Sequence, residues 1–172
     1  MEAISRLEQA AADRRYVRRA IEISRGALDD NGKSPFGALI VVAGAVAGEG
    51  INRVVERHDP TAHAEVMALR AAGQALGRAT FDDGVLYSSA EPCPMCLSAC
   101  YWARIPRVVY AATSHDAAAS GFEDLQLYRE ITRPRGERVA REYVAGDDLH
   151  AAAAAVLRDW AEQRPGPVEP KF

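Results

Sequence analysis

The sequence is poor in cysteine and has no long apolar run. It holds three cysteines in 172 residues, too few for the framework of disulfide bonds that small secreted proteins use. Charged residues appear from Glu2 and Arg6 onward, so no N-terminal stretch suits a signal peptide or a membrane span. We therefore expect a cytoplasmic protein that does not span a membrane.

An excess of basic charge is also lacking. Lysine and arginine total 21 against 24 aspartates and glutamates, which gives a net charge of −3 at pH 7. Proteins that grip a nucleic-acid backbone usually carry a basic patch or a basic balance. Four arginines do cluster within residues 14–19, but their spacing is typical of the solvated face of a helix. A nucleic-acid partner is therefore disfavoured.

Length and composition indicate one domain. The chain is 48% hydrophobic and 26% charged, as in an ordinary globular protein, and 172 residues can bury a real core. It contains no internal repeat and no linker. Three prolines within residues 164–172 prevent regular helix and central strand there. We expect a single domain over residues 1–172 that ends in a tail at 164–172.

Hydrophobic periodicity predicts alternating strands and helices. The predicted helices cover residues 13–28, 61–76, 94–103 and 148–163, with short helices within 116–131. The predicted strands cover residues 36–42, 46–51, 84–90 and 107–112, with a hairpin turn at Ala43 and Gly44. This order favours a three-layer α/β/α sandwich around a mixed sheet of about five strands.

Two short motifs carry the chemistry. The first is His63-Ala64-Glu65. The second is Pro92-Cys93-Pro94-Met95-Cys96, whose first cysteine lies 28 residues after Glu65. Zinc prefers imidazole and thiolate ligands in a tetrahedron, and a site with three protein ligands keeps a position open for catalysis. His63, Cys93 and Cys96 are therefore the predicted zinc ligands. Glu65 supplies a carboxylate that is not required as a metal ligand.

The spacing of these residues has a mechanical reason. Cys93 and Cys96 are three residues apart, so both thiolates share one face at the start of a helix, where the helix dipole favours thiolate. His63 and Glu65 are two residues apart and point in different directions. One can therefore bind metal while the other faces a substrate.

Two other interpretations of the cysteines stay open. A C-x-x-C pair can be redox-active, although no thioredoxin-like context surrounds this one. Cys100 could complete a four-ligand structural site, although an apolar role inside the helix suits it better. A non-catalytic zinc module is thus the alternative from a different class of function.

The motif pattern H-x-E…P-C-x-x-C is a signature of zinc-dependent nucleobase deaminases. The chain resembles the cytidine-deaminase-like superfamily over about residues 14–138. Within it, Trp102 and the strings Asp116-Ala117-Ala118 and Gly121-Phe122-Glu123-Asp124 resemble the guanine deaminase branch. The alanine run at 151–155 departs from that branch.

The resemblance implies a hydrolase that acts on the C–N bond of a cyclic amidine, converting guanine to xanthine and ammonia. Glu65 is implied as the catalytic proton shuttle. The implied substrate-binding residues are Phe36, Asn52, Ala64, Trp102 and Asp124. Among these, Phe36 and Trp102 are expected to sandwich the base. A homodimer is also implied, in which Trp160 or Phe172 near the C-terminus covers an active site.

Three substrate alternatives remain within the same chemistry. Another aminated heterocycle such as cytosine or a triazine, the nucleoside guanosine, and adenosine in tRNA all present an amino group to hydrolysis. The acidic balance of charge disfavours the tRNA substrate.

Overall fold

The computed structural model describes residues 2–122 and 124–166, which fall into two units, residues 1–128 and 129–172. In chain order the elements are α1 (Glu2–Arg25), β1 (Ser34–Val42), β2 (Ala45–Asn52), α2 (Val54–Arg57), α3 (Ala64–Leu76), β3 (Gly84–Ala90), α4 (Pro94–Trp102), β4 (Arg107–Ala112), α5 (Ser114–Ala119), α6 (Asp124–Ile131), η1 (Arg135–Glu137, a 3₁₀ helix) and α7 (Asp147–Glu162). No helix within the described ranges has the length and apolar character needed to span a bilayer.

The first unit is built on one mixed sheet with strand order β2-β1-β3-β4. β1 pairs antiparallel with both β2 and β3, and β3 pairs parallel with β4. The α/β fold is as predicted, but the described residues form four strands rather than about five. After β4 the chain turns to helix, and the β-forming residues Val139, Tyr143 and Val144 are exposed and pair with no described strand.

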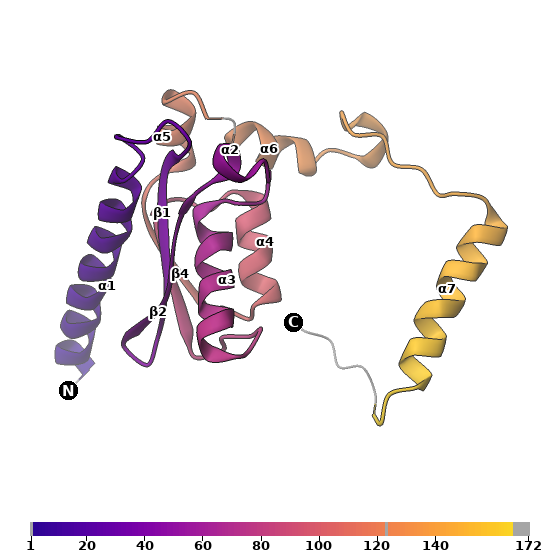
Figure 1. Cartoon of the computed structure of the whole chain (residues 1–172), viewed down its shortest axis with the longest axis horizontal. Helices are drawn as coiled ribbons and strands as arrows, with labels where there is room; N and C mark the ends of the chain where they lie inside the picture. Colours follow the sequence, from indigo (N-terminus) through magenta and orange to yellow (C-terminus); the bar gives the residue numbers. More distant parts are fainter. Residues whose placement is uncertain (1, 123, 167–172) are drawn as a thin grey trace. The chain divides into compact units, whose positions relative to one another are not determined.

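Helices cover both faces of this sheet (Figure 1), with α1 on one side and α3 and α4 on the other. Alternate residues of β1 serve the two faces, which explains its continuous apolar run. Leu39 and Val41 pack with Tyr16 and Ala20 of α1. On the opposite face one core cluster joins the sheet to α3 and α4, and it contains Ala38, Ile40, Ala64, Ala68, Ala72, Phe81, Leu86, Cys100, Ala103 and Ile105.

The boundaries near the active-site motifs differ from the sequence prediction. The helix expected from residue 61 begins at Ala64, because the preceding residues form a turn in which Asp59 accepts the backbone N–H of Thr61 at 2.8 Å. The short helix α2 was not predicted. The hairpin turn is confirmed: Ala43 and Gly44 both have positive φ, at 50° and 77°, as a tight hairpin with right-handed twist requires.

Two glycines of β2 allow α3 to lie directly on the strand. A Cβ atom on Gly50 would lie 2.2 Å from the carbonyl oxygen of Ala64, and one on Gly48 would lie 2.4 Å from the backbone nitrogen of Ala72. Backbone cannot yield to such contacts as a flexible side chain can. The absence of a side chain at Gly48 and Gly50 therefore fixes the position of α3, which begins beside His63 and carries Glu65.

Gly50→Ala should lower the free energy of unfolding by about 3 kcal/mol or more, since the added methyl group overlaps backbone. Gly136→Ala is the matched control, because a Cβ there meets nothing within 4 Å; it should change stability by less than about 1 kcal/mol. Urea unfolding of both variants checks this. Similar stability of the two variants would show that α3 does not depend on this close approach.

Hydrogen bonds to Asp13 connect α1 to β3 and β4. Asp13 accepts hydrogen bonds from both terminal nitrogens of Arg107, from the hydroxyl group of Tyr87 at 2.8 Å and from Gln9 at 3.0 Å. The Arg107 guanidinium, more than any other group, lowers the pKa of Asp13 to about 2. Burial and the hydrogen bond to Asp13 raise the pKa of Tyr87 to about 12.

Asp13→Asn should lower the stability by about 1 to 2 kcal/mol at neutral pH, because Arg107 loses its charged partner. The folded-state pKa of Asp13 is depressed, so its contribution is full above about pH 4 and is lost as pH falls toward about 2. Unfolding curves measured against pH check this, with Asp83→Asn at the exposed ion pair to Arg78 as control. If the free energy of unfolding of Asp13→Asn differs from that of the unchanged protein by the same amount at every pH below 4, the proposed role of Asp13 is contradicted.

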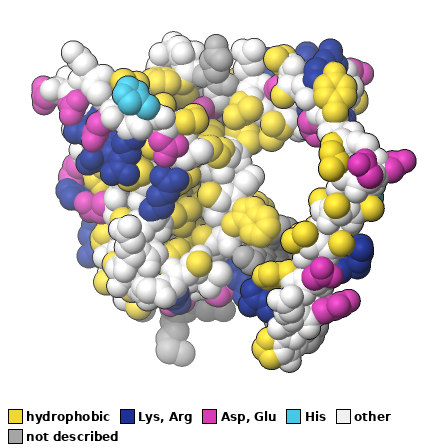
Figure 2. Space-filling model, turned by 45° about the vertical axis from the view of Figure 1, so that its right-hand side comes forward, with side chains coloured by type: hydrophobic (Ala, Val, Ile, Leu, Met, Phe, Trp, Pro, Cys, Tyr) yellow, Lys and Arg dark blue, Asp and Glu magenta, His cyan; other side chains and the backbone are white. Residues whose placement is uncertain are grey.

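The second unit is dominated by α7. None of its residues is buried, and Leu149, Val156, Leu157 and Trp160 are each about half exposed or more. Figure 2 shows hydrophobic side chains exposed along this helix at the right of the view. Arg164 lies over the ring of Trp160 at 3.9 Å. The expectation of a single domain with a tail from residue 164 stays a prediction, and residues 167–172 lie outside the described residues.

Candidate active site

The metal-binding motifs lie at the starts of two helices. His63 is the N-cap residue of α3, and Cys93 is the N-cap residue of α4, with Pro94 at its first helical position. Neither side chain caps its own helix. Both are extended in their backbone, which turns the side chains away from the helix and leaves them available to a metal ion.

The three predicted ligands form one group with zinc-like geometry. Nδ1 of His63 lies 3.6 Å from Sγ of Cys93, which lies 3.6 Å from Sγ of Cys96. All three donor atoms are within 4.8 Å of one another. A tetrahedral zinc ion with Zn–S near ~2.3 Å and Zn–N near ~2.0 Å spaces two sulfurs about 3.8 Å apart and a sulfur and a nitrogen about 3.5 Å apart. The sulfur–sulfur spacing and the sulfur–nitrogen spacing at Cys93 therefore match those around a tetrahedral zinc ion.

Electrostatics favour thiolate at this point. The hydrogen bond between the Cys93 and Cys96 side chains lowers the pKa of Cys93 to about 4, and His63 lowers it further. That same interaction, together with burial, raises the pKa of Cys96. The hydrogen bond to Cys93 raises the pKa of His63. The positive end of the α4 dipole also stabilises negative charge at Cys93.

Glu65 lies beside the three donors but outside their set. It is only 5% exposed, and its carboxyl group accepts hydrogen bonds from Ser88 at 3.3 Å and from the Cys96 thiol at 3.4 Å. Burial raises its pKa. A carboxyl group that holds a proton more strongly than usual, next to a metal site, is suited to move protons during a reaction. Ser88 was not identified from the sequence, where a serine in a strand gives no signal.

A pocket of about 230 Å³ opens beside these residues. It brings together six of the predicted site residues, which are Phe36, Asn52, His63, Glu65, Cys93 and Asp124. They come from β1, β2, the starts of α3 and α4, and the start of α6. Residues far apart in the chain thus share one small concave site, and a polar edge and an apolar wall both face its interior.

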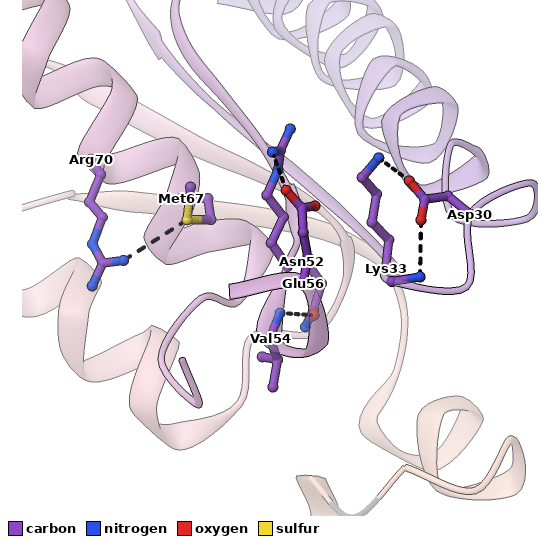
Figure 3. Close-up of polar contacts among 9 residues, drawn as sticks. Asp30, Lys33, Asn52, Val54, Glu56, Met67 and Arg70 are labelled. Carbon is purple, nitrogen blue, oxygen red and sulfur yellow. Dashed lines mark hydrogen bonds and ion pairs between the residues drawn. The ribbon is translucent and has the colours of Figure 1, made fainter. Parts of the chain in front are cut away.

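Asn52 and Asp124 supply the polar edge of this pocket. Asn52 is 5% exposed, and its Oδ1 accepts the N–H of Val54 at 3.1 Å (Figure 3). Its side-chain amide is thereby held in one orientation, with the nitrogen as the group left for a ligand. Asp124 stands in the first turn of α6, and burial raises its pKa.

The side chains of two predicted substrate-binding residues, Ala64 and Trp102, do not line this pocket. Trp102 is the last residue of α4, nine residues beyond Cys93, or about 13 Å along the helix, and it is 57% exposed. Ala64 is fully buried in the core under α3. The predicted sandwich of Phe36 and Trp102 is therefore not formed within the described chain. Phe36 instead meets Phe122 edge to face, with ring centroids 4.7 Å apart.

Phe122 is the aromatic residue that sequence reasoning missed. It lines the pocket together with Phe36 and Asp124. The signal was present, because Phe122 lies two residues before Asp124 in a string already associated with the guanine branch. Phe122 received no role because nothing in the local sequence shows that the start of α6 faces the metal site.

Cys100 is excluded from the metal group. It is 2% exposed and belongs to the core cluster with Ala38 and Ile40. Burial raises its pKa to about 12, which keeps it a neutral thiol. The group of potential donors found among the described residues therefore has three ligands and leaves one side open.

Residues 10–112 match the cytidine and deoxycytidylate deaminase zinc-binding region. The chain belongs to this deaminase family. The match covers both metal-binding motifs, and zinc is the metal of the family. The resemblance that the two motifs carry is thereby confirmed.

Individual relatives extend the similarity over most of the chain. Guanine deaminase of Bacillus subtilis (strain 168) is 43% identical over 149 residues, which cover 87% of this chain and 96% of that protein. The solved structure of guanine deaminase from Bacillus subtilis has a TM-score of 0.82 and covers 90% of this chain. The tRNA-specific adenosine deaminase of Haemophilus influenzae is 36% identical over 121 residues, covering 67% of this chain and 69% of that protein.

Cys96→Ala should abolish stoichiometric zinc binding, because two donors do not complete the site. Cys100→Ala is the matched control and should keep close to one zinc per chain. Elemental analysis of the purified proteins by mass spectrometry checks both. Zinc loss in Cys100→Ala with a folded protein would mean that the fourth position is closed by Cys100 and that the site is structural.

Proposed function

We propose that this protein is a zinc-dependent hydrolase that deaminates guanine to xanthine and ammonia. The observation that carries the proposal is the buried carboxyl group of Glu65, placed against Cys96 beside three metal donors and facing a small pocket. A structural zinc site has no use for such a group. The similarity to guanine deaminase of Bacillus subtilis over 87% of this chain supports the choice of base.

In this proposal His63, Cys93 and Cys96 hold the zinc ion. When bound, zinc would lower the pKa of a water molecule to about 7 and so supply a nucleophile at neutral pH. Glu65 accepts a proton from the attacking water and passes it to the purine ring nitrogen. It then takes the second proton from the hydroxyl group added at C2 and gives it to the amino group; the C–N bond breaks, ammonia leaves and the carbonyl group of xanthine forms. Its raised pKa suits both halves of this transfer.

The pocket residues orient the base. The amide of Asn52 and the carboxyl group of Asp124 can pair with the donors and acceptors along the edge of guanine. Phe36, backed by Phe122, supplies an apolar surface for the flat ring. The pocket volume of about 230 Å³ lies below the usual range for larger ligands, which begins near ~300 Å³, and therefore favours a free base over a nucleoside.

The test is ammonia release from a panel of guanine, guanosine, cytosine, adenine and a triazine, with a tRNA anticodon stem as a further substrate. Guanine should be turned over much faster than the other compounds, because a pocket with fixed polar partners rejects analogues that leave them unpaired. Glu65→Gln, the control, should keep zinc but lose at least about a thousandfold in kcat. Turnover of adenosine in tRNA but not of guanine would overturn the choice of substrate. Full activity of Glu65→Gln would overturn the mechanism.

We propose further that the protein works in the cytoplasm as a homodimer whose C-terminal segment closes an active site. The exposed apolar residues of α7, including Trp160, support an additional contact for this helix. A proline-rich tail loses little entropy when it docks, and closure excludes water from the pocket.

Deletion of residues 164–172 should raise KM for guanine or lower kcat at least about fivefold, corresponding to about 1 kcal/mol, with zinc content unchanged. Sedimentation velocity should show a dimer for the full chain. A fully active monomer, or unchanged kinetics after the deletion, would rule out the closing role of the tail.

A further inference from the structure

An arginine-lined cleft of the first unit lies away from the zinc pocket. It has a volume of about 420 Å³ and runs along β2, the edge strand of the sheet, between α1, α2 and α3. Arg53, Arg57 and Arg70 line it, with Glu49 as the one acidic side chain. Its lining shares no residue with the zinc pocket, whose wall is formed by Val54 and Val55 of the same short helix.

Most of the charged side chains around this cleft form ion pairs, and Arg57 is the exception. Arg19 from α1 holds Glu49 with two hydrogen bonds, at 2.7 and 2.8 Å, which neutralises the one acidic side chain in the lining. Arg57 makes no ion pair with any residue that the structure describes. The backbone N–H of Arg57 donates to the carbonyl of Arg53 at 2.9 Å, so these two arginines follow one another by a single helical turn.

The other two arginines are held only by exposed partners. Arg53 contacts Glu56 at 2.9 Å, and Arg70 contacts Asp59 at 3.3 Å. Arg70 also lies 3.9 Å from the sulfur of Met67, as Figure 3 shows. All four of these charged side chains are a third or more exposed. Such pairs contribute only about 0 to 1 kcal/mol, so a ligand can replace the carboxylates at little cost.

We propose that this cleft binds a phosphate-bearing small molecule of the nucleoside polyphosphate class. Guanidinium groups bind phosphate with paired hydrogen bonds, and three of them around one cleft match a chain of phosphates. Ile51 and Met67 in the same lining offer an apolar surface to an organic group. The enclosed volume suits a small molecule, and the net charge of −3 gives no general attraction for a nucleic-acid strand.

Arginines on α1 do not form an equivalent site. Arg19 is engaged by Glu49, and Arg15 stacks on Tyr16 at 4.5 Å from the ring centroid and donates to its hydroxyl group. Arg18 also lines this groove, which therefore holds one arginine outside these contacts, whereas three arginines line the cleft along β2. The cleft along β2 keeps arginine charge that internal contacts do not use.

Isothermal titration with ATP, inorganic tripolyphosphate and adenosine tests the site in the full-length zinc-loaded protein. ATP should bind and adenosine should not; binding of tripolyphosphate would show that the phosphates alone suffice. Arg57→Gln and Arg70→Gln should each weaken ATP binding at least tenfold. Arg78→Gln, at an exposed ion pair outside the cleft, is the matched control and should bind ATP as the unchanged protein does.

The proposal is overturned if ATP and tripolyphosphate do not bind at about 0.15 M ionic strength. It is also overturned if Arg57→Gln and Arg70→Gln bind ATP as tightly as Arg78→Gln does. Zinc content after titration distinguishes binding at the cleft from removal of the metal. The measurement does not involve guanine, so its outcome is independent of the proposed deaminase activity.

Discussion

The meeting of two helix starts is the constraint on which the site depends. His63 and Cys93 occupy N-cap positions, where polar side chains usually satisfy the first N–H groups of a helix. Here both side chains turn toward a common point instead, and Cys96 completes the group from the first turn of α4. The dipole of α4 favours thiolate there, so the fold itself lowers the cost of gathering negative charge.

Packing along β2 and β3 holds these helix starts in place. Gly48 and Gly50 let α3 rest on the strand backbone, and this close contact fixes Glu65 over the sheet. Ser88 on β3 then meets the Glu65 carboxyl group, while β3 leads directly into the loop before Cys93. One sheet thus positions the metal ligands and the proton-transfer group together, and burial at this junction raises the pKa of Glu65.

Local sequence patterns predicted most of the fold and the centre of the site. The H-x-E and C-x-x-C motifs indicated the metal group, and alternation gave all four strands that are described. The sheet has four described strands where about five were predicted. The short helix α2 and the roles of Ser88 and Phe122 were not predicted, because each depends on contacts between distant segments. The role of Trp102 in substrate binding stays a prediction, since α4 carries this residue away from the metal site of its own chain.

The central claim is that the zinc ion has three protein ligands and one open position beside Glu65. Zinc K-edge X-ray absorption on the purified protein measures this coordination directly. The account predicts two sulfur atoms at about 2.3 Å and two nitrogen or oxygen atoms at about 2.0 Å, which correspond to Cys93, Cys96, His63 and a water molecule. Three sulfur atoms, or a protein folded and active without zinc, would contradict it.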